Sequence, residues 1–320
     1  MIRSVCLLLL SIFFISCKKE ISNTTVNKMQ IMLQTLSASD RSALDRFWGH
    51  LIHDYNYAYT LFGDKPISLA SYSLKPNAHA TYYPDADVVF REGWKTWCCC
   101  TSQFVSKQFV LKRDLEECGH IYFYLINKSA VLNTIKKYLV VFQHQLGPEI
   151  DAATLTEQLC DPNGNLLATI KNSSELYGIL LGYGQENAWK FGRKVNLCHL
   201  INVKANPPLQ ATVEGLLNPL AKYLAELYNY SGKQNEIFSE ETEIALAEEL
   251  NTIMDQQAGW ELLDSDYFLD KFIAPMYMSS KEGLQQPTQV DFVAIRENIR
   301  KHYQQGDFLE VTLNQFMNDN

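Results

Sequence analysis

The first firm pattern of apolar residues begins after Ser39 and has the spacing of a helix. Apolar side chains recur there at i, i+3, i+4, i+7 and i+8, along one side of a helix that we expect to run to about residue 61: Leu44, Phe47, Trp48, Leu51 and Ile52. Ser39 or Asp40 is expected to cap this helix. Gly63 and Pro66 then end it, because Pro66 has no backbone N–H and restricts the residue before it.

Helical spacing recurs through most of the remaining chain. We expect one helix over 87–104 and another that Asn127 caps and Gly147 ends, with an apolar stripe of Val131, Ile135, Tyr138, Leu139 and Phe142. Further helices are predicted, in chain order, over 151–160, 175–192, 209–230, 240–257, 292–304 and 308–318. The sequence is therefore predominantly helical.

Two β-rich runs form the clearest strand pattern. Residues 108–115 and 120–126 are separated by four loop residues that include Gly119, which predicts a hairpin, and 67–74 alternates well enough for a short strand. We therefore expect an α+β fold, predominantly α-helical, with a small antiparallel sheet. Gly182-Tyr183-Gly184 lies inside a helical pattern and is too short for a phosphate loop. This, with the lack of βαβ alternation, argues against P-loop or Rossmann nucleotide binding.

The leader over residues 1–16 indicates export. It has a basic start at Arg3, an apolar run over 5–15 that only Ser11 interrupts, and the small residue Ser16 before a cysteine, which is the pattern of a secretory signal peptide. The apolar run is about eleven residues long, whereas a membrane-spanning helix needs about 20. Plain secretion and a retained N-terminus stay open as alternatives.

Phe14-Ile15-Ser16-Cys17 resembles the lipobox of bacterial lipoproteins, although Phe14 stands where leucine is common. The resemblance implies that the Cys17 thiol carries a diacylglyceryl group, that the leader is cut before Cys17, and that the new amine is acylated, for instance with palmitate. Such lipids would hold the protein at a membrane of the cell envelope, in the periplasm or facing the surface. The expected organisation is a signal peptide at 1–16, a lipid-anchored tether at 17–38, and a single mainly helical domain at 39–320 with a possible sub-boundary near 206–208.

The charge of the chain limits the class of partner, and its cysteine content limits the number of disulfides. Without Arg3 of the leader, 27 of the 28 basic residues remain against 36 acidic ones, a balance of −9 that argues against a nucleic-acid partner. The 47% of apolar residues can fill a large core.

After Cys6 leaves with the leader and Cys17 takes lipid, six thiols remain: Cys98, Cys99, Cys100, Cys118, Cys160 and Cys198. We expect one or two disulfides at most, or a fully reduced state.

A cysteine hydrolase is the sharpest catalytic hypothesis. A thiolate nucleophile needs an imidazole that lowers its pKa, and a helical thiol among Cys98, Cys99 and Cys100 with His120 at the start of a strand supplies this pair. Residues 118–125 resemble the histidine strand of a family of cell-wall cysteine peptidases, whose Asp-Cys-Ser-Gly signature is absent here. The alternative interpretation is a buried cysteine triplet beside a histidine at a hairpin end.

Other side chains indicate weaker candidate sites. His50 and His53 share a helix face and could both ligate zinc, but the spacing of established zinc motifs is missing and such histidines more often pack or hydrogen-bond. No pair of carboxylates can be chosen for glycoside hydrolysis from Asp85, Asp87, Glu92, Glu116, Glu117 and Glu186. Three cations near an expected helix end complement the helix dipole rather than bind a phosphate: Lys190, Arg193 and Lys194.

The aromatic stretch over 55–62 has two interpretations. It forms either a helix with half-buried tyrosines, or an exposed surface that binds a sugar or another envelope protein. The blocks 61–66, 178–184 with 186–188, and 306–313 are similar to uncharacterised proteins of chlamydia-like intracellular bacteria, a resemblance that implies one co-folded unit but no activity or cofactor. The sequence therefore predicts a lipid-anchored envelope protein that is a structural or interaction module. The alternative is a cell-envelope cysteine hydrolase.

Overall fold

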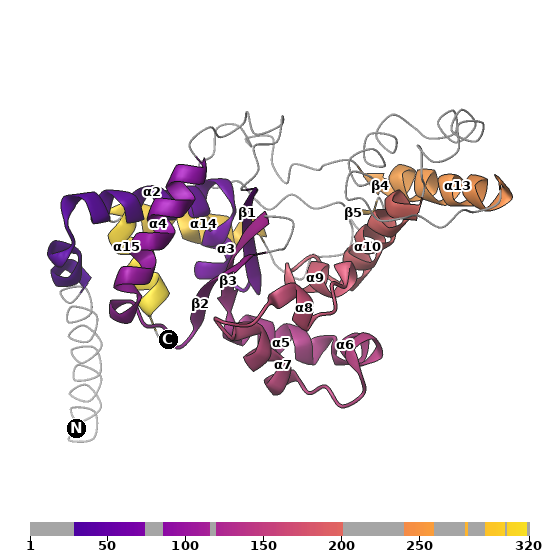
Figure 1. The fold of residues 1–320 in the computed structure, drawn as a ribbon, viewed down its shortest axis with the longest axis horizontal. Helices are drawn as coiled ribbons and strands as arrows, with labels where there is room; N and C mark the ends of the chain where they lie inside the picture. The colour runs from indigo at the N-terminus through magenta and orange to yellow at the C-terminus, as the bar shows by residue number, and fades with distance from the viewer. Residues whose placement is uncertain are drawn as a thin grey trace, which may run out of the picture. The chain divides into compact units, whose positions relative to one another are not determined.

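The computed structural model describes residues 29–73, 86–115, 120–200, 240–258, 279–280, 292–304 and 306–318 (Figure 1). Within these ranges the fold is α+β and mainly helical, with a small three-stranded antiparallel sheet, as the sequence predicts. None of the helices in these ranges has the length and apolar character of a membrane span. The leader, Cys17, the possible boundary near 206–208 and the predicted helix over 209–230 lie outside the described residues.

Contacts between Cα atoms divide the chain into two compact units. The described parts of Met1–Gly63, Ser68–Asn127 and Ile295–Asn320 form unit 1, and those of Asp64–Ile67 and Lys128–Ala294 form unit 2. All or most of the following elements belong to unit 1: α2 (Ala38–Asp54), α3 (Tyr57–Leu61), β1 (Ile67–Ser73), α4 (Ala86–Cys100), a 3₁₀ turn (Thr101–Gln103), β2 (Phe109–Leu115), β3 (His120–Asn127), α14 (Phe292–Tyr303) and α15 (Phe308–Met317). The C-terminal helices thus return to the unit that contains the N-terminal ones.

Helix α2 confirms the predicted apolar stripe but ends earlier than predicted. The predicted cap is wrong: Ser37, rather than Ser39 or Asp40, caps the helix by accepting a hydrogen bond of 3.0 Å from the Asp40 backbone N–H. The five stripe residues are at most 1% exposed. The prediction of one helix to residue 61 is wrong, because Asn56 takes the left-handed conformation (φ 63°) and separates α2 from α3. Asparagine tolerates this conformation better than most residues, so the break has a local cause. A helix over 29–35, with Met29 and Leu33 buried, precedes α2, so the packed region begins before residue 39.

The sheet has the strand order β1-β3-β2, and β2 pairs with β3 as the predicted hairpin, with Leu111 opposite Leu125. One face of β3 carries Phe123, which lies against rings from α2 and α4. The ring of Phe123 stacks on Phe90 at 5.0 Å and meets the edge of Phe47 at 5.8 Å between centroids. These aromatic contacts form the core of unit 1.

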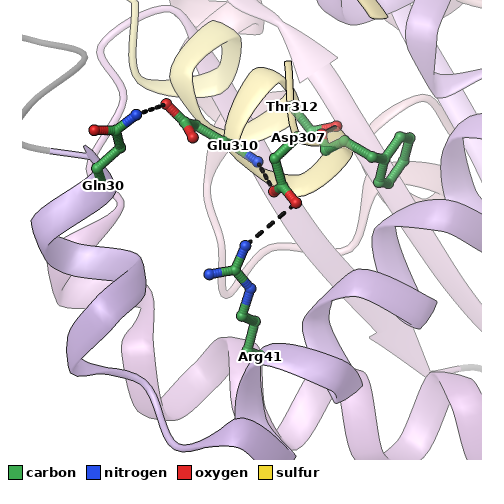
Figure 2. Close-up of polar contacts among 6 residues, drawn as sticks. Gln30, Arg41, Asp307, Glu310 and Thr312 are labelled. Atoms are coloured by element: carbon green, nitrogen blue, oxygen red, sulfur yellow. Dashed lines mark hydrogen bonds and ion pairs between the residues drawn. The ribbon is translucent and has the colours of Figure 1, made fainter.

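Helix α15 packs its Phe316 ring against the tryptophans of α2 and α4, 5.8 Å from Trp48 and 5.3 Å from Trp97. Asp307 caps α15 by accepting a hydrogen bond from the Glu310 N–H at 3.0 Å, and it also pairs with Arg41 of α2 at 3.2 Å (Figure 2). These contacts join the two ends of the described chain within unit 1.

The described residues of unit 2 form helices and one two-residue strand pair. Its elements are α5 (Lys128–Lys137), α6 (Leu139–Leu146), α7 (Ala152–Cys160), α8 (Leu166–Thr169), α9 (Ser174–Leu180), α10 (Gln185–Leu200), α13 (Glu240–Gln256), β4 (Gln257–Ala258) and β5 (Ser279–Ser280). Two predicted helices are each divided. Tyr138 separates α5 from α6, and Asn127, the predicted cap, is the last residue of β3.

The second division separates α9 from α10 and corrects the prediction of one helix over 175–192. Gly182 (φ 90°) and Gly184 (φ 78°) adopt positive φ values that glycine reaches without strain. The segment that the sequence pattern places inside a helix is therefore a turn. Because of this turn, α9 and α10 lie against each other along their lengths.

Candidate ligand pocket on helices α9 and α10

The thiols of the predicted nucleophile triplet lie at the end of α4. Cys98 and Cys99 are exposed, Cys100 is buried, and all three are free. Burial raises the pKa of the Cys98 thiol, which Arg113 partly opposes, and burial also raises the pKa of the Cys100 thiol. A raised pKa keeps a thiol protonated at neutral pH and makes it a weak nucleophile. The side chain of His120 lies outside the described part, so its pairing with a thiol stays a prediction.

His50 and His53 contact different neighbours. The His50 ring lies 5.1 Å from Phe90 between centroids and its Nδ1 contacts the Asp54 carboxylate, whereas the His53 ring stacks on Phe308 at 5.3 Å. In the ranges that the structure describes, no three His, Cys, Asp or Glu side chains gather in a way that could hold a metal ion. The zinc hypothesis therefore gains no support.

The aromatic stretch over 55–62 is core rather than an exposed surface. Tyr57 and Tyr59 are 0% exposed, and the Tyr57 hydroxyl donates a hydrogen bond of 2.7 Å to the Phe123 carbonyl. The break at Asn56 is the physical reason, because it releases α3 from the direction of α2 and lets α3 pack on β3. The stretch consequently offers no broad aromatic face to a partner.

Only two of the six candidate carboxylates have described side chains, and they lie in different units. Glu92 in unit 1 pairs with Arg46 at 3.2 Å, and Glu186 in unit 2 pairs with Lys190 at 2.9 Å. The other four candidates fall on residues whose positions or side chains lie outside the described set: Asp85, Asp87, Glu116 and Glu117. The glycosidase hypothesis is therefore not supported by a described pair.

Unit 2 contains a polar pocket of about 300 Å³ between α10 and the start of α9. One wall is a face of α10 on which four residues follow each other at i, i+3, i+4 and i+7: Trp189, Gly192, Arg193 and Asn196. The opposite wall consists of residues 172–175 and of Gln145 at the end of α6. Trp189 is 51% exposed, which is unusual for so large an apolar side chain.

Two glycines allow the two helices to come close enough to form this pocket. A Cβ on Gly178 of α9 would lie 2.8 Å from the Ala188 Cβ, and a Cβ on Gly192 of α10 would lie 3.2 Å from the Glu175 backbone N. Ser173 caps α9 by accepting a hydrogen bond from the Leu176 N–H at 3.2 Å. The pocket walls are thus held by the packing of the helices.

Hydrogen bonds hold the polar side chains on the α9 side. The Gln145 amide donates to a Glu175 carboxylate oxygen at 2.6 Å and accepts from the Ser173 hydroxyl at 2.5 Å. The Lys171 ammonium donates to the Leu146 carbonyl at 3.0 Å, which ties the end of α6 to the segment before α9. These bonds orient Gln145 and Glu175 toward the pocket that they line.

Arg193 is already engaged on the α10 side. Its Nε and one terminal nitrogen donate to the two carboxylate oxygens of Glu249 of α13 at 2.7 and 2.6 Å, a bidentate pair. The hydrogen bonds to Glu249 raise the pKa of the Arg193 guanidinium, and those from Arg193 lower the pKa of the Glu249 carboxyl. Both groups therefore stay charged at neutral pH and neutralise each other.

Four lining side chains remain uncommitted within the part of the chain that the structure describes. No hydrogen bond or ring contact of the side chain is found there for Asn172, Ser174, Trp189 or Asn196. They supply two amides, one hydroxyl and one indole, which are neutral groups that bind polar, uncharged ligands. The pocket can therefore hold a small ligand, and its charged members are arranged to support the walls.

Trp189 is not among the residues that the sequence pattern indicated as candidates. The pattern predicted a helix end near Lys190, Arg193 and Lys194, but α10 continues to Leu200, so these residues lie in its middle. The Lys194 ammonium is buried over the Phe191 ring at 4.9 Å, which is a packing contact. One sequence pattern could have indicated the pocket: a helix face at i, i+3, i+4 and i+7 that combines a tryptophan with polar side chains instead of aliphatic ones.

Comparison with known proteins identifies no family for this chain. The sequence matches no protein-family model, and neither the curated proteins nor the solved structures contain a significant match.

Proposed function

We propose that this chain is a lipid-anchored protein of the cell envelope that works as a non-enzymatic binding module and holds a polar ligand near the membrane. The anchoring half of the proposal is supported by the leader over 1–16 and by Cys17. Met29, the first residue that the structure describes, is buried, and residues 18–28 separate it from Cys17 in the sequence. Fully extended, such a segment spans at most roughly 40 Å, which keeps Met29 close to the bilayer.

The observation that carries the binding half is the polar pocket beside the exposed Trp189. Its neutral polar side chains are uncommitted among the described residues, while Glu175 and Arg193 are oriented by protein partners. A pocket with fixed walls and a few free polar groups is the usual form of a ligand site. The cysteine hydrolase is the second candidate, and the raised pKa of the Cys98 and Cys100 thiols weighs against it.

The anchor is tested by acyl labelling. Cells that express the full chain are fed an alkyne analogue of palmitate, and the protein is extracted from membranes for fluorescence detection and intact mass. We expect label, loss of residues 1–16 and added acyl mass. Cys17→Ala should lose both label and membrane association, and Cys160→Ala, which changes a thiol of α7, should keep both. An unlabelled wild-type protein that is cut elsewhere would refute the anchor.

The hydrolase alternative is tested on the same purified protein by the rate of thiol alkylation at pH 7. A protonated thiol reacts slowly, so we expect Cys98 and Cys100 to react no faster than a small-molecule thiol. Rapid alkylation of one triplet cysteine, slowed by His120→Ala, would reverse the order of the two proposals.

A further inference from the structure

We infer that the α9–α10 pocket binds a neutral saccharide, with one sugar ring lying on the indole of Trp189. This inference rests on the proposed binding function and adds the class of ligand. Three observations lead to it: the exposed aromatic face, the charge balance of the walls, and the kind of polar groups that remain uncommitted.

The exposed indole face points to a ligand with an apolar side. Trp189 is 51% exposed and belongs to the wall of the pocket rather than to the core. The face of an aromatic ring is negative, so it attracts groups with a positive edge. The axial C–H bonds of a pyranose ring form such an edge, and its hydroxyl groups lie around the rim.

The charges of the walls disfavour an ionic ligand. A phosphate needs donors from a cation, but the Arg193 guanidinium already forms a bidentate pair with Glu249. A ligand ammonium would have to approach the Glu175 carboxylate, which Gln145 already engages, with Arg193 lining the same pocket. A neutral ligand can bind without breaking either the Arg193–Glu249 pair or the Gln145–Glu175 hydrogen bond.

The uncommitted polar groups match hydroxyl groups. The amides of Asn172 and Asn196 each carry donors and an acceptor, and the Ser174 hydroxyl can do both. Sugar hydroxyls likewise donate and accept, so each can find a partner on either wall. The volume of about 300 Å³ is small for a ligand pocket, which favours a short saccharide.

The test is calorimetric titration of the protein purified from cells that express the full chain, whether or not it carries lipid, in a detergent that contains no sugar. The probes are chitotriose, cellotriose and maltotriose, with inorganic phosphate and putrescine as charged alternatives. We expect at least one trisaccharide to bind and both ions to give no heat. Trp189→Ala should weaken saccharide binding by about tenfold, and Trp189→Phe, which keeps an aromatic face, should weaken it by less. Val140→Ala changes another exposed apolar residue of unit 2 away from the pocket lining and should leave binding unchanged.

Several outcomes would overturn the inference. These are the lack of heat with all three trisaccharides at millimolar concentration, undiminished saccharide binding in Trp189→Ala, phosphate binding that Arg193→Gln abolishes, or putrescine binding that Glu175→Gln abolishes. Far-ultraviolet circular dichroism of each variant verifies that it is folded. If the saccharides fail while Cys17 is labelled, only the ligand class falls; if they bind while Cys17 is unlabelled, only the anchor falls.

Discussion

Replacement of Gly93 by alanine tests how closely α4 approaches α2 in unit 1. Gly93 is buried, and a Cβ at this position would lie 2.3 Å from the Cβ and 2.5 Å from the Cγ of Phe47. Carbon atoms in favourable contact are about 3.5–4.0 Å apart, so the helices would have to separate by about 1 Å. Rotation of the Phe47 ring cannot relieve the overlap, because the Cβ atom is fixed to the backbone.

The expected magnitude follows from two opposing effects. Overpacking of a core costs about 1–3 kcal/mol and occasionally more, while glycine to alanine within a helix gains about 1 kcal/mol. Because 2.3 Å is a severe overlap and Phe47 is 0% exposed among other rings, we expect the upper part of this range. Gly93→Ala should therefore lower the free energy of unfolding by about 2 kcal/mol, which changes the folded-to-unfolded ratio by about 30-fold.

Gly49→Ala is the matched control on the other helix of the same pair. A Cβ on Gly49 would meet only the Phe308 ring, at 3.9 Å, which is ordinary contact. This variant should gain up to about 1 kcal/mol from helix propensity. Urea denaturation followed by near-ultraviolet circular dichroism, which reports the aromatic core, measures both changes in the free energy of unfolding. The dependence of that free energy on urea concentration should be the same in both variants as in the wild type. A Gly93→Ala protein at least as stable as the wild type would refute the close approach.

Three further predictions concern helix capping and the titration of two charged groups. Asp307→Ala should cost about 1 kcal/mol through loss of the α15 cap, whereas Asp307→Asn, which still caps, and Arg41→Ala, from an exposed pair, should each cost about 0.5 kcal/mol or less in urea denaturation. Burial lowers the pKa of Lys65 to about 7, so above pH 7 the unfolded chain binds more protons than the folded one. The stability of the wild type relative to Lys65→Met should therefore rise as the pH increases from 7 toward 10.5, by as much as about 1.4 kcal/mol per pH unit. A stability difference that does not change with pH would contradict this. The hydrogen bonds from Arg193 lower the pKa of Glu249 in the folded state from 4.5, so this ion pair stabilises the protein above pH 4.5 and its contribution is lost as the pH falls through the lowered pKa. Glu249→Gln should therefore lower the free energy of unfolding by no more than about 1 kcal/mol at pH 7, measured by thermal denaturation, and should leave it unchanged in strong acid.

Several features of this protein follow from the sequence by itself. The spacing of the stripe from Leu44 to Ile52 identified both the helix and its buried side, and alternation around Gly119 identified the hairpin whose strands pair as β2 and β3. The helices predicted over 151–160 and 308–318 begin within one residue of the observed starts of α7 and α15. These features depend on neighbours three or four positions away, so a local pattern is sufficient to read them.

Only the tertiary structure decided where the long helical patterns are divided and what covers each face. Asn56 and Gly182 permit left-handed turns, but local sequence does not reveal whether packing will use them. The turn at Asn56 buries Tyr57 against β3, and the turn at Gly182 brings the Trp189 face of α10 beside residues 172–175. Both the core and the candidate pocket arise from contacts between segments that a periodic pattern cannot pair, because periodicity records which side of an element is apolar and not which element lies against it.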